Sequence, residues 1–255
     1  RLWQRYLGKP ERIIELITEN NEGPAYAEVF EWGLSTALWQ ECEQGNVIEI
    51  INRFCPKRSQ GLSTGEYLAL ASINRSIQAM SKASVWEWFS KTTLIRHMHE
   101  ADKGALSSQR FWDHMDRVTP RKAEEIWKCI VSETIKREAI DLSSISYDGT
   151  NFYTFIDTFN TRCAIAKRGK NKQGRSNLRQ VSYALFCTAD SHIPLYYDIY
   201  EGNRNDSRQF PEMLTRFYGF WKEIAQAEMK VPDTTLFSTR EITRGIILSS
   251  LIRVA

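Results

Sequence analysis

The amino-acid sequence predicts an α+β fold in which a helical region precedes a mixed β-sheet domain. Apolar residues recur at helical spacing through about residue 140. Near Ala139-Ile140-Asp141 the period changes, and three short apolar runs, a long amphipathic helix and a fourth run follow in that order. We therefore expect a helical region over 1–140, a sheet domain over 141–237 and a separate tail over 238–255.

The composition is that of an ordinary globular protein, and it excludes several classes. The 255 residues are 42% hydrophobic and 25% charged, and no apolar run approaches the roughly 20 residues that span a bilayer. Five cysteines are scattered without a Cys-x-x-Cys pair, at positions 42, 55, 129, 163 and 187. This usage favours reduced thiols in a cytoplasmic protein over a disulfide framework or a zinc site. We expect no membrane partner and no small-molecule cofactor.

Helix boundaries in the first region are marked by capping residues. The pattern predicts helices that begin at Pro10, cover Ala25 to Gln44, and cover Val47 to Phe54. Further starts are predicted at the capping boxes Ser63-x-x-Glu66 and Ser84-x-x-Glu87, at Ser107-Ser108 for a helix through Val118, and at Thr119-Pro120.

The second region predicts strands around one acidic residue. The runs are Ile145 to Phe152 with a continuation to Phe159, Val181 to Cys187, Ile193 to Tyr200, and a last start at Thr234 to Phe237. A helix with an apolar stripe from Phe210 to Ile224 separates the last two.

A basic segment lies between the first two predicted strands. From Arg162 to Arg179 there are seven Lys or Arg residues and no Asp or Glu, an electrostatic pattern suited to phosphate contact. The candidate DNA-binding residues in it are Lys167, Arg168, Lys170, Lys172, Arg175 and Arg179. The alternative is a solvated loop that has no partner.

Asp148 is the candidate catalytic and metal-binding residue. Phosphoryl transfer to DNA by two metal ions requires carboxylates that are held rigidly, and a central strand provides such a position. The alternative is local, because an Asp before Gly149-Thr150-Asn151 can simply begin a turn.

Several motifs, taken in order, resemble the DDE transposases of prokaryotic insertion sequences. The shared motifs are Tyr147-Asp148-Gly149-Thr150-Asn151-Phe152, Lys167-Arg168-Gly169-Lys170-Asn171-Lys172, Leu178-Arg179-Gln180-Val181, Pro194-Leu195 with Gly202-Asn203-Arg204-Asn205-Asp206, and upstream Gly61 to Leu68, Ile73-Asn74-Arg75 and Ser107 to Trp112. The resemblance implies that residues 141–237 are an incomplete RNase H-like core, of the kind that cuts and joins double-stranded DNA at transposon ends with Mg²⁺ or Mn²⁺. In the same way it implies that the helical region over 1–140 serves DNA binding or assembly. It also implies a nucleoid-associated location, and it leaves open whether the chain forms a homodimer.

The turn before the long helix has two interpretations. Asn203 is a candidate for contact with DNA, whereas capping of the following helix explains Asp206 or Ser207. No Ser-His-Asp arrangement is suggested, and His97 and His99 lie two residues apart, which places them on different sides of a helix.

The end of the sequence departs from the family pattern. The resemblance implies a second Asp and a later Glu, and neither is present. From position 236 the family reads Leu-Val-Phe-Asp-Lys-Gly-Asn, whereas this chain reads Leu236-Phe237-Ser238-Thr239-Arg240. One inserted base after codon 236 permits a coding sequence for the family motif, so we expect a frameshifted tail and an inactive product. The alternatives are a non-catalytic DNA-binding remnant and another RNase H-like nuclease, although Asp157, Asp190 and Asp198 have no motif around them.

Overall fold

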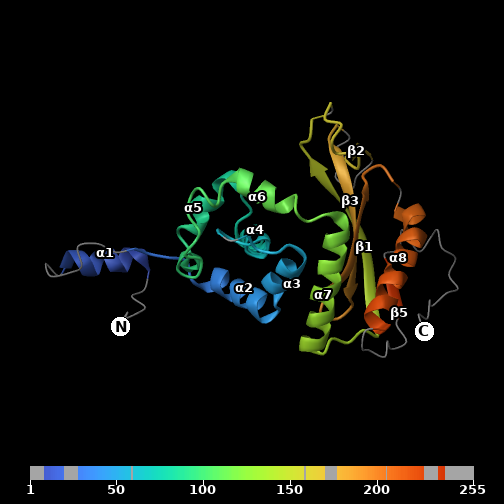
Figure 1. Cartoon of the computed structure of the whole chain (residues 1–255), viewed down its shortest axis with the longest axis horizontal. Coiled ribbons are helices and arrows are strands. Elements are labelled where there is room, and N and C mark those ends of the chain that lie inside the picture. The colour runs from blue at the N-terminus through green and yellow to red at the C-terminus, as the bar shows by residue number, and fades with distance from the viewer. Residues whose placement is uncertain are drawn as a thin grey trace. The chain divides into compact units, whose positions relative to one another are not determined.

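The computed structural model describes residues 9–19, 28–58, 60–157, 159–169, 177–204, 206–226 and 235–238. The chain divides into two compact units between Ile126 and Trp127, and each unit is described by itself (Figure 1). The positions of Lys170, Lys172, Arg175 and 239–255 lie outside the described residues, as do the side chains of 206–208.

The first unit is helical. Its elements are α1 (Pro10–Glu19), α2 (Gly33–Gln44), α3 (Val47–Phe54), α4 (Thr64–Ile77), α5 (Val85–Phe89), α6 (Ser108–Met115), two short 3-10 turns at Lys82–Ser84 and Thr93–Arg96, and the first part of α7 (Pro120–Glu138). Its core is aromatic and aliphatic, and the fully buried side chains include Leu70, Phe89 and Phe111. Among the described residues, no helix is long and apolar enough to cross a membrane.

The helix starts predicted from capping residues have different outcomes. At α4 the capping box is confirmed, because Glu66 N donates to Ser63 Oγ at 3.2 Å and Ser63 N donates to Glu66 Oε2 at 2.6 Å. The Ser84 box is wrong, because a 3-10 turn precedes α5 and Ser84 makes no capping hydrogen bond with its side chain. The prediction that α6 reaches Val118 is also wrong, because Val118 N turns back to Met115 O at 3.0 Å.

The predicted helix over Ala25 to Gln44 is too long at its start. Helix α2 begins at Gly33, and residues 28–32 precede it without helical structure. Tertiary pairing explains the difference: Glu31 N donates to Lys91 O at 2.7 Å, and Thr93 N donates to Glu31 O at 2.9 Å. The main-chain groups of Glu31 are therefore used by a distant segment, and helical spacing alone could not show this.

The second unit contains a mixed five-stranded sheet. Its strands are β1 (Ser144–Thr154), β2 (Lys167–Arg168), β3 (Arg179–Thr188), β4 (Pro194–Glu201) and β5 (Thr235–Ser238), and α8 (Asp206–Gln226) lies between the last two. Strand β3 pairs antiparallel with β1 on one edge and with both β2 and β4 on the other, while β5 pairs parallel with the free edge of β1. Strand β1 is therefore central.

One face of the sheet is covered by α8. The Tyr147 ring lies 4.8 Å from that of Phe210, and its hydroxyl donates to Met213 Sδ at 3.8 Å. Phe186 stacks on Phe217 at 4.4 Å between ring centroids. Tyr147, Phe186 and Met213 are at most 2% exposed, so this contact is the core of the second unit. Helix α7 contributes Val131 and Ile135 to the same core, and its Lys128 pairs with Glu223 of α8.

Candidate functional site

Asp148 projects from the central strand, on the face opposite the α8 core. Successive side chains of a strand point to opposite faces. Tyr147 and Gly149 are buried, whereas Asp148 and Thr150 are exposed. The Cα partner of Asp148 is Leu185 on β3. Strand β3 pairs with Asp148 on one edge of β1, and β5 pairs with the preceding Tyr147 on the other edge. The carboxylate therefore extends from an ordered strand into a solvent-accessible position.

The face that carries Asp148 also carries a row of aromatic rings. Phe152 lies 5.9 Å from Tyr183, Tyr183 stacks 5.9 Å from Tyr197, and Tyr197 meets Trp127 edge-on at 5.2 Å. The Trp127 indole N–H donates to Leu195 O at 3.0 Å. Burial, followed by the neighbouring Tyr197, raises the pKa of Tyr183, so its hydroxyl stays neutral at neutral pH. The Tyr183 hydroxyl therefore adds no negative charge to that of Asp148.

A short basic strand lies beside the start of β3. Lys167 pairs with Gln180 and Arg168 pairs with Arg179, where Lys167 is half-buried and Arg168 is exposed. By strand alternation Arg168 falls on the same face as Asp148. The separation between Asp148 and the basic strand can be followed along β3. Asp148 pairs with Leu185 and Lys167 pairs with Gln180, and these two β3 residues are five apart, or about 17 Å. That span corresponds to about five base pairs along a DNA axis.

Arg179 holds the segment that leads into the basic strand. Its Nε donates to Ala166 O at 2.6 Å and its Nη2 donates to Cys163 O at 2.8 Å. Its Nη1 donates to Asp157 O at 2.9 Å and to Asn160 O at 2.8 Å. A guanidinium has five N–H donors in a fixed fork, and four of them are used here on main-chain carbonyls. This geometry favours a positioning role, and direct phosphate contact by Arg179 stays a prediction.

The Gly202-Asn203 turn meets the basic strand. Gly202 N donates to Ile165 O at 3.1 Å, and Gln180 Nε2 donates to Gly202 O at 2.6 Å. A Cβ added at Gly169 would lie 2.6 Å from Gly202 O and 3.1 Å from Asn203 Cα. Three sequence motifs, spread over more than thirty residues of the chain, are therefore packed together around the buried Gln180 side chain. Asn203 is exposed at the edge of this cluster.

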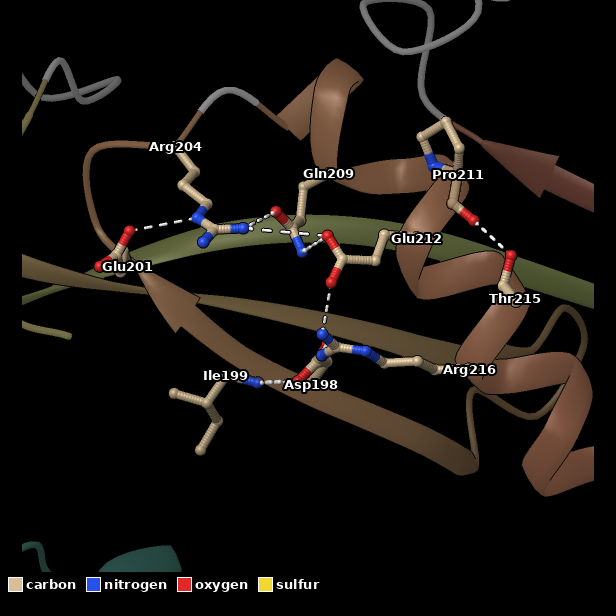
Figure 2. A network of polar contacts seen from close by, with 9 residues as sticks. All are labelled: Asp198, Ile199, Glu201, Arg204, Gln209, Pro211, Glu212, Thr215 and Arg216. Atoms are coloured by element: carbon tan, nitrogen blue, oxygen red, sulfur yellow. Dashed lines mark hydrogen bonds and ion pairs between the residues drawn. The ribbon is translucent and has the colours of Figure 1, made fainter.

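An ion-pair network fastens β4 to α8 behind this turn (Figure 2). Arg216 binds Asp198 at 2.7 Å and Glu212 at 2.5 Å. Arg204 binds Glu201 at 3.1 Å, and its Nη1 donates to Gln209 Oε1 at 2.9 Å. Asp198 and Glu201 are therefore neutralised by arginines, which makes them structural acids and weak candidates for metal binding.

The described residues do not form a metal centre. No group of three or more His, Cys, Asp or Glu side chains in the described ranges could hold a metal ion. The Asp148 carboxylate makes no hydrogen bond or ion pair with another described residue, and a single carboxylate does not define the geometry that Mg²⁺ requires. The residues on this face therefore do not fit the Mg²⁺ or Mn²⁺ site that the sequence resemblance implies.

The aromatic row and the role of Arg179 were not identified from the sequence. Alternation in Val181 to Cys187 and in Tyr196 to Tyr200 marks two half-buried faces, and it could have placed Tyr183 on the Asp148 face. The bonds of Arg179 reach back across a segment with no regular structure, so no periodic signal reports them.

Gly202→Ala should disrupt the packed motifs, because a Cβ there would lie 2.0 Å from Gln180 O. We expect a loss of roughly 1–3 kcal/mol in stability, as for an overpacked site. Gly219→Ala is the matched control, since its Cβ would meet nothing within 4 Å and alanine favours a helix interior. The stability of both variants is measured by thermal melting, and the packing around β2 and β3 by hydrogen exchange of their amides. Equal melting temperatures and unchanged exchange in the two variants would contradict this packing.

Comparison with known proteins adds no family. No protein-family model matches the chain, and no curated protein matches it. Among solved structures the chain is similar to the Mos1 transposase paired-end complex with left transposon end, at 10% sequence identity and a TM-score of 0.21. The match covers 86% of this chain and 62% of that chain. A TM-score this low carries no argument, so function is inferred from the chain's own residues.

Proposed function

We propose that this chain derives from an insertion-sequence transposase, and that its second unit is an RNase H-like core that binds double-stranded DNA. The observation that carries the proposal is the strand order. Strands β1, β3 and β4 follow in chain order with only the two-residue β2 between the first two, and they pair antiparallel. Helix α8 follows, and β5 then pairs parallel with the other edge of β1. A cytoplasmic, nucleoid-associated location goes with this function, and a homodimer is left open.

The placement of Asp148 supports the same proposal. It is the acidic residue of the sequence motif Tyr147 to Phe152, and it lies exposed on the central strand of the sheet. A nucleotidyl-transfer core of this kind presents its first carboxylate at that position. Tyr147 of the same motif is buried against Phe210 of α8, so it anchors the motif in the core while Asp148 stays exposed.

DNA binding is supported by the meeting of the basic strand with the Gly202-Asn203 turn. Arg168 and Asn203 are exposed there, and the surrounding sequence from Arg162 to Arg179 contains no acidic residue. Cations on a sheet edge can follow a phosphate backbone without reading base sequence. Lys170, Lys172 and Arg175 belong to the same proposal by sequence.

The residues on the Asp148 face favour DNA binding without DNA cleavage. Strand alternation also places Glu201 on the Asp148 face, but Glu201 is paired with Arg204. No group of three or more acidic, His or Cys side chains among the described residues can hold a metal ion. A non-catalytic DNA-binding protein is therefore the second candidate function. Another RNase H-like nuclease is a weaker candidate, because Asp198 is already paired with Arg216.

The β1–β5 register supports the frameshift. Ile145 pairs with Leu236, and Tyr147 pairs with Ser238. The same pairing, continued by one residue, would bring position 239 beside Asp148. In the shifted reading frame, the motif Leu-Val-Phe-Asp that begins at codon 236 has its Asp at position 239. The shifted reading frame is a hypothesis that codon degeneracy permits, and in it the second Asp would directly follow Ser238, the last paired residue of β5.

Removal of the two positive charges of β2 should weaken the binding of duplex DNA and make that binding less dependent on salt. We expect Lys167→Ala/Arg168→Ala to lower the slope of log affinity against log salt by about 0.9 for each phosphate that the strand no longer neutralises. Fluorescence anisotropy with a labelled duplex at several salt concentrations measures this slope. Lys222→Ala is the control, since Lys222 lies on α8 over the Tyr218 ring at 4.5 Å. A slope equal to that of the unmodified chain would remove β2 from the interface.

The 255-residue chain should neither nick nor join transposon-end DNA. The physical reason is that one carboxylate cannot bind two metal ions in line with the scissile phosphate. Incubation of supercoiled plasmid with the purified chain in Mg²⁺ or Mn²⁺, read on an agarose gel, measures this. Metal-dependent nicking that disappears in Asp148→Asn would show that the missing ligands are supplied elsewhere in the chain.

A further inference from the structure

Three phenylalanines are exposed where β1 ends and the following segment begins. Phe152 is 57% exposed, Phe155 is 87% exposed and Phe159 is 91% exposed. Single exposed apolar side chains are common on protein surfaces, but three exposed phenylalanines within eight residues are a concentration that calls for an explanation. We call Phe152, Phe155 and Phe159 the phenylalanine surface.

The segment that carries these rings is held in a defined conformation. Arg179 binds the carbonyls of Asp157, Asn160, Cys163 and Ala166. Phe159 N donates to Asp157 Oδ1 at 2.7 Å, and Arg162 N donates to Asn160 Oδ1 at 2.9 Å. Arg179 itself is fixed at the start of β3 by strand pairing. The polar groups of the segment therefore bond to one another and to Arg179, while its phenylalanines face outward.

The charge around the phenylalanine surface indicates what it contacts. From Gly149 to Ala189 the one acidic residue is Asp157, and its carboxylate already accepts the Phe159 amide. The same stretch contains seven Lys or Arg residues, which include Arg162 and Arg168. A second copy of this chain would bring two basic surfaces together, which repel each other. Exposed aromatic rings beside cations fit a polyanion that itself carries flat aromatic groups.

We infer that the phenylalanine surface stacks the bases of unpaired DNA while the adjacent basic strand binds its phosphates. This inference rests on the proposed DNA binding and adds a preference within it. Bases in an intact duplex are stacked on each other, so the rings contact them only where the strands are separated. Phe152 lies on the Asp148 face, so an opened strand that contacts it also passes along that face.

The test compares single-stranded and duplex oligonucleotides of the same sequence, by fluorescence anisotropy with the full chain at fixed salt. Phe155→Ala/Phe159→Ala should weaken single-strand binding about 5-fold to 100-fold for each base that is no longer stacked, while duplex binding changes less than about 2-fold. Phe155→Tyr/Phe159→Tyr should keep single-strand affinity, whereas Phe155→Leu/Phe159→Leu, which stays apolar, should lose it. Quenching of 2-aminopurine in the strand reports stacking directly.

Two controls separate stacking from other effects. Leu34→Ala removes another exposed apolar side chain, 53% exposed, from α2 of the helical unit and should change neither affinity. Thermal melting should be the same for the Ala, Leu and Tyr variants, because the replaced rings are outside the core.

The outcomes distinguish this inference from the function it rests on. If the unmodified chain binds duplex DNA but the Ala and Leu variants bind single strands as well as it does, the inference is overturned and the proposed function stands. If the Leu variant keeps single-strand affinity, the surface makes only apolar contact and stacking is overturned. If the unmodified chain binds neither oligonucleotide, both proposals fall.

Discussion

The antiparallel pairing of β1 with β3 is the constraint on which the second unit depends. It runs from Ile145 with Thr188 to Thr154 with Arg179, so one continuous register sets the direction of every side chain on both strands. A shift by one residue would send Tyr147 out of the core and Asp148 into it. Burial of Tyr147 against Phe186, Phe210 and Met213 opposes such a shift. The exposed carboxylate is thus fixed by apolar packing on the other face.

The same pairing supplies the anchor for the segment beyond β1. Arg179 ends the ladder, and from there its guanidinium reaches the carbonyls of residues 157 to 166. That segment carries the exposed phenylalanines and leads into the basic strand β2. A residue that looks like a phosphate ligand in the sequence therefore orders the surface on which other residues would contact DNA. Its replacement by Lys would keep the charge but lose the planar fork that binds several carbonyls together.

Much of the second unit could be predicted from the sequence, because its signals are local. Alternation marked β3, short apolar runs marked β1 and β4, and the stripe from Phe210 to Ile224 marked α8, all within a few residues of their bounds. The first unit was predicted less well at its helix starts. Glu31 is held by Lys91 and Thr93 far along the chain, and Ser84 belongs to a preceding turn, so tertiary contacts overrode local preference at both places.

In the candidate site, too, the sequence predicts what depends on local motifs and misses what depends on tertiary contacts. Asp148 and the basic residues near Lys167 follow from motifs that are contiguous in sequence, although the strand β2 was not predicted. The contact of Gly202 with Ile165 and Gln180 joins segments that no periodic pattern connects. Three glycine- or arginine-containing motifs that look like separate recognition elements are one packed unit around Gln180. Residues 170–176 and 239–255 are outside the described structure, so the predictions for Lys170, Lys172, Arg175 and the tail stay predictions.

The nucleotide sequence across codons 236–250 tests the central claim most directly, because that claim joins a sheet register to a lost reading frame. Strand β5 pairs with β1 through Ser238, and the proposed shifted frame would encode Asp at the next position. We predict that restoring one base after codon 236 yields Leu-Val-Phe-Asp-Lys-Gly-Asn followed by a long open frame. A frame that stops at once, or that encodes an unrelated sequence, would contradict the claim.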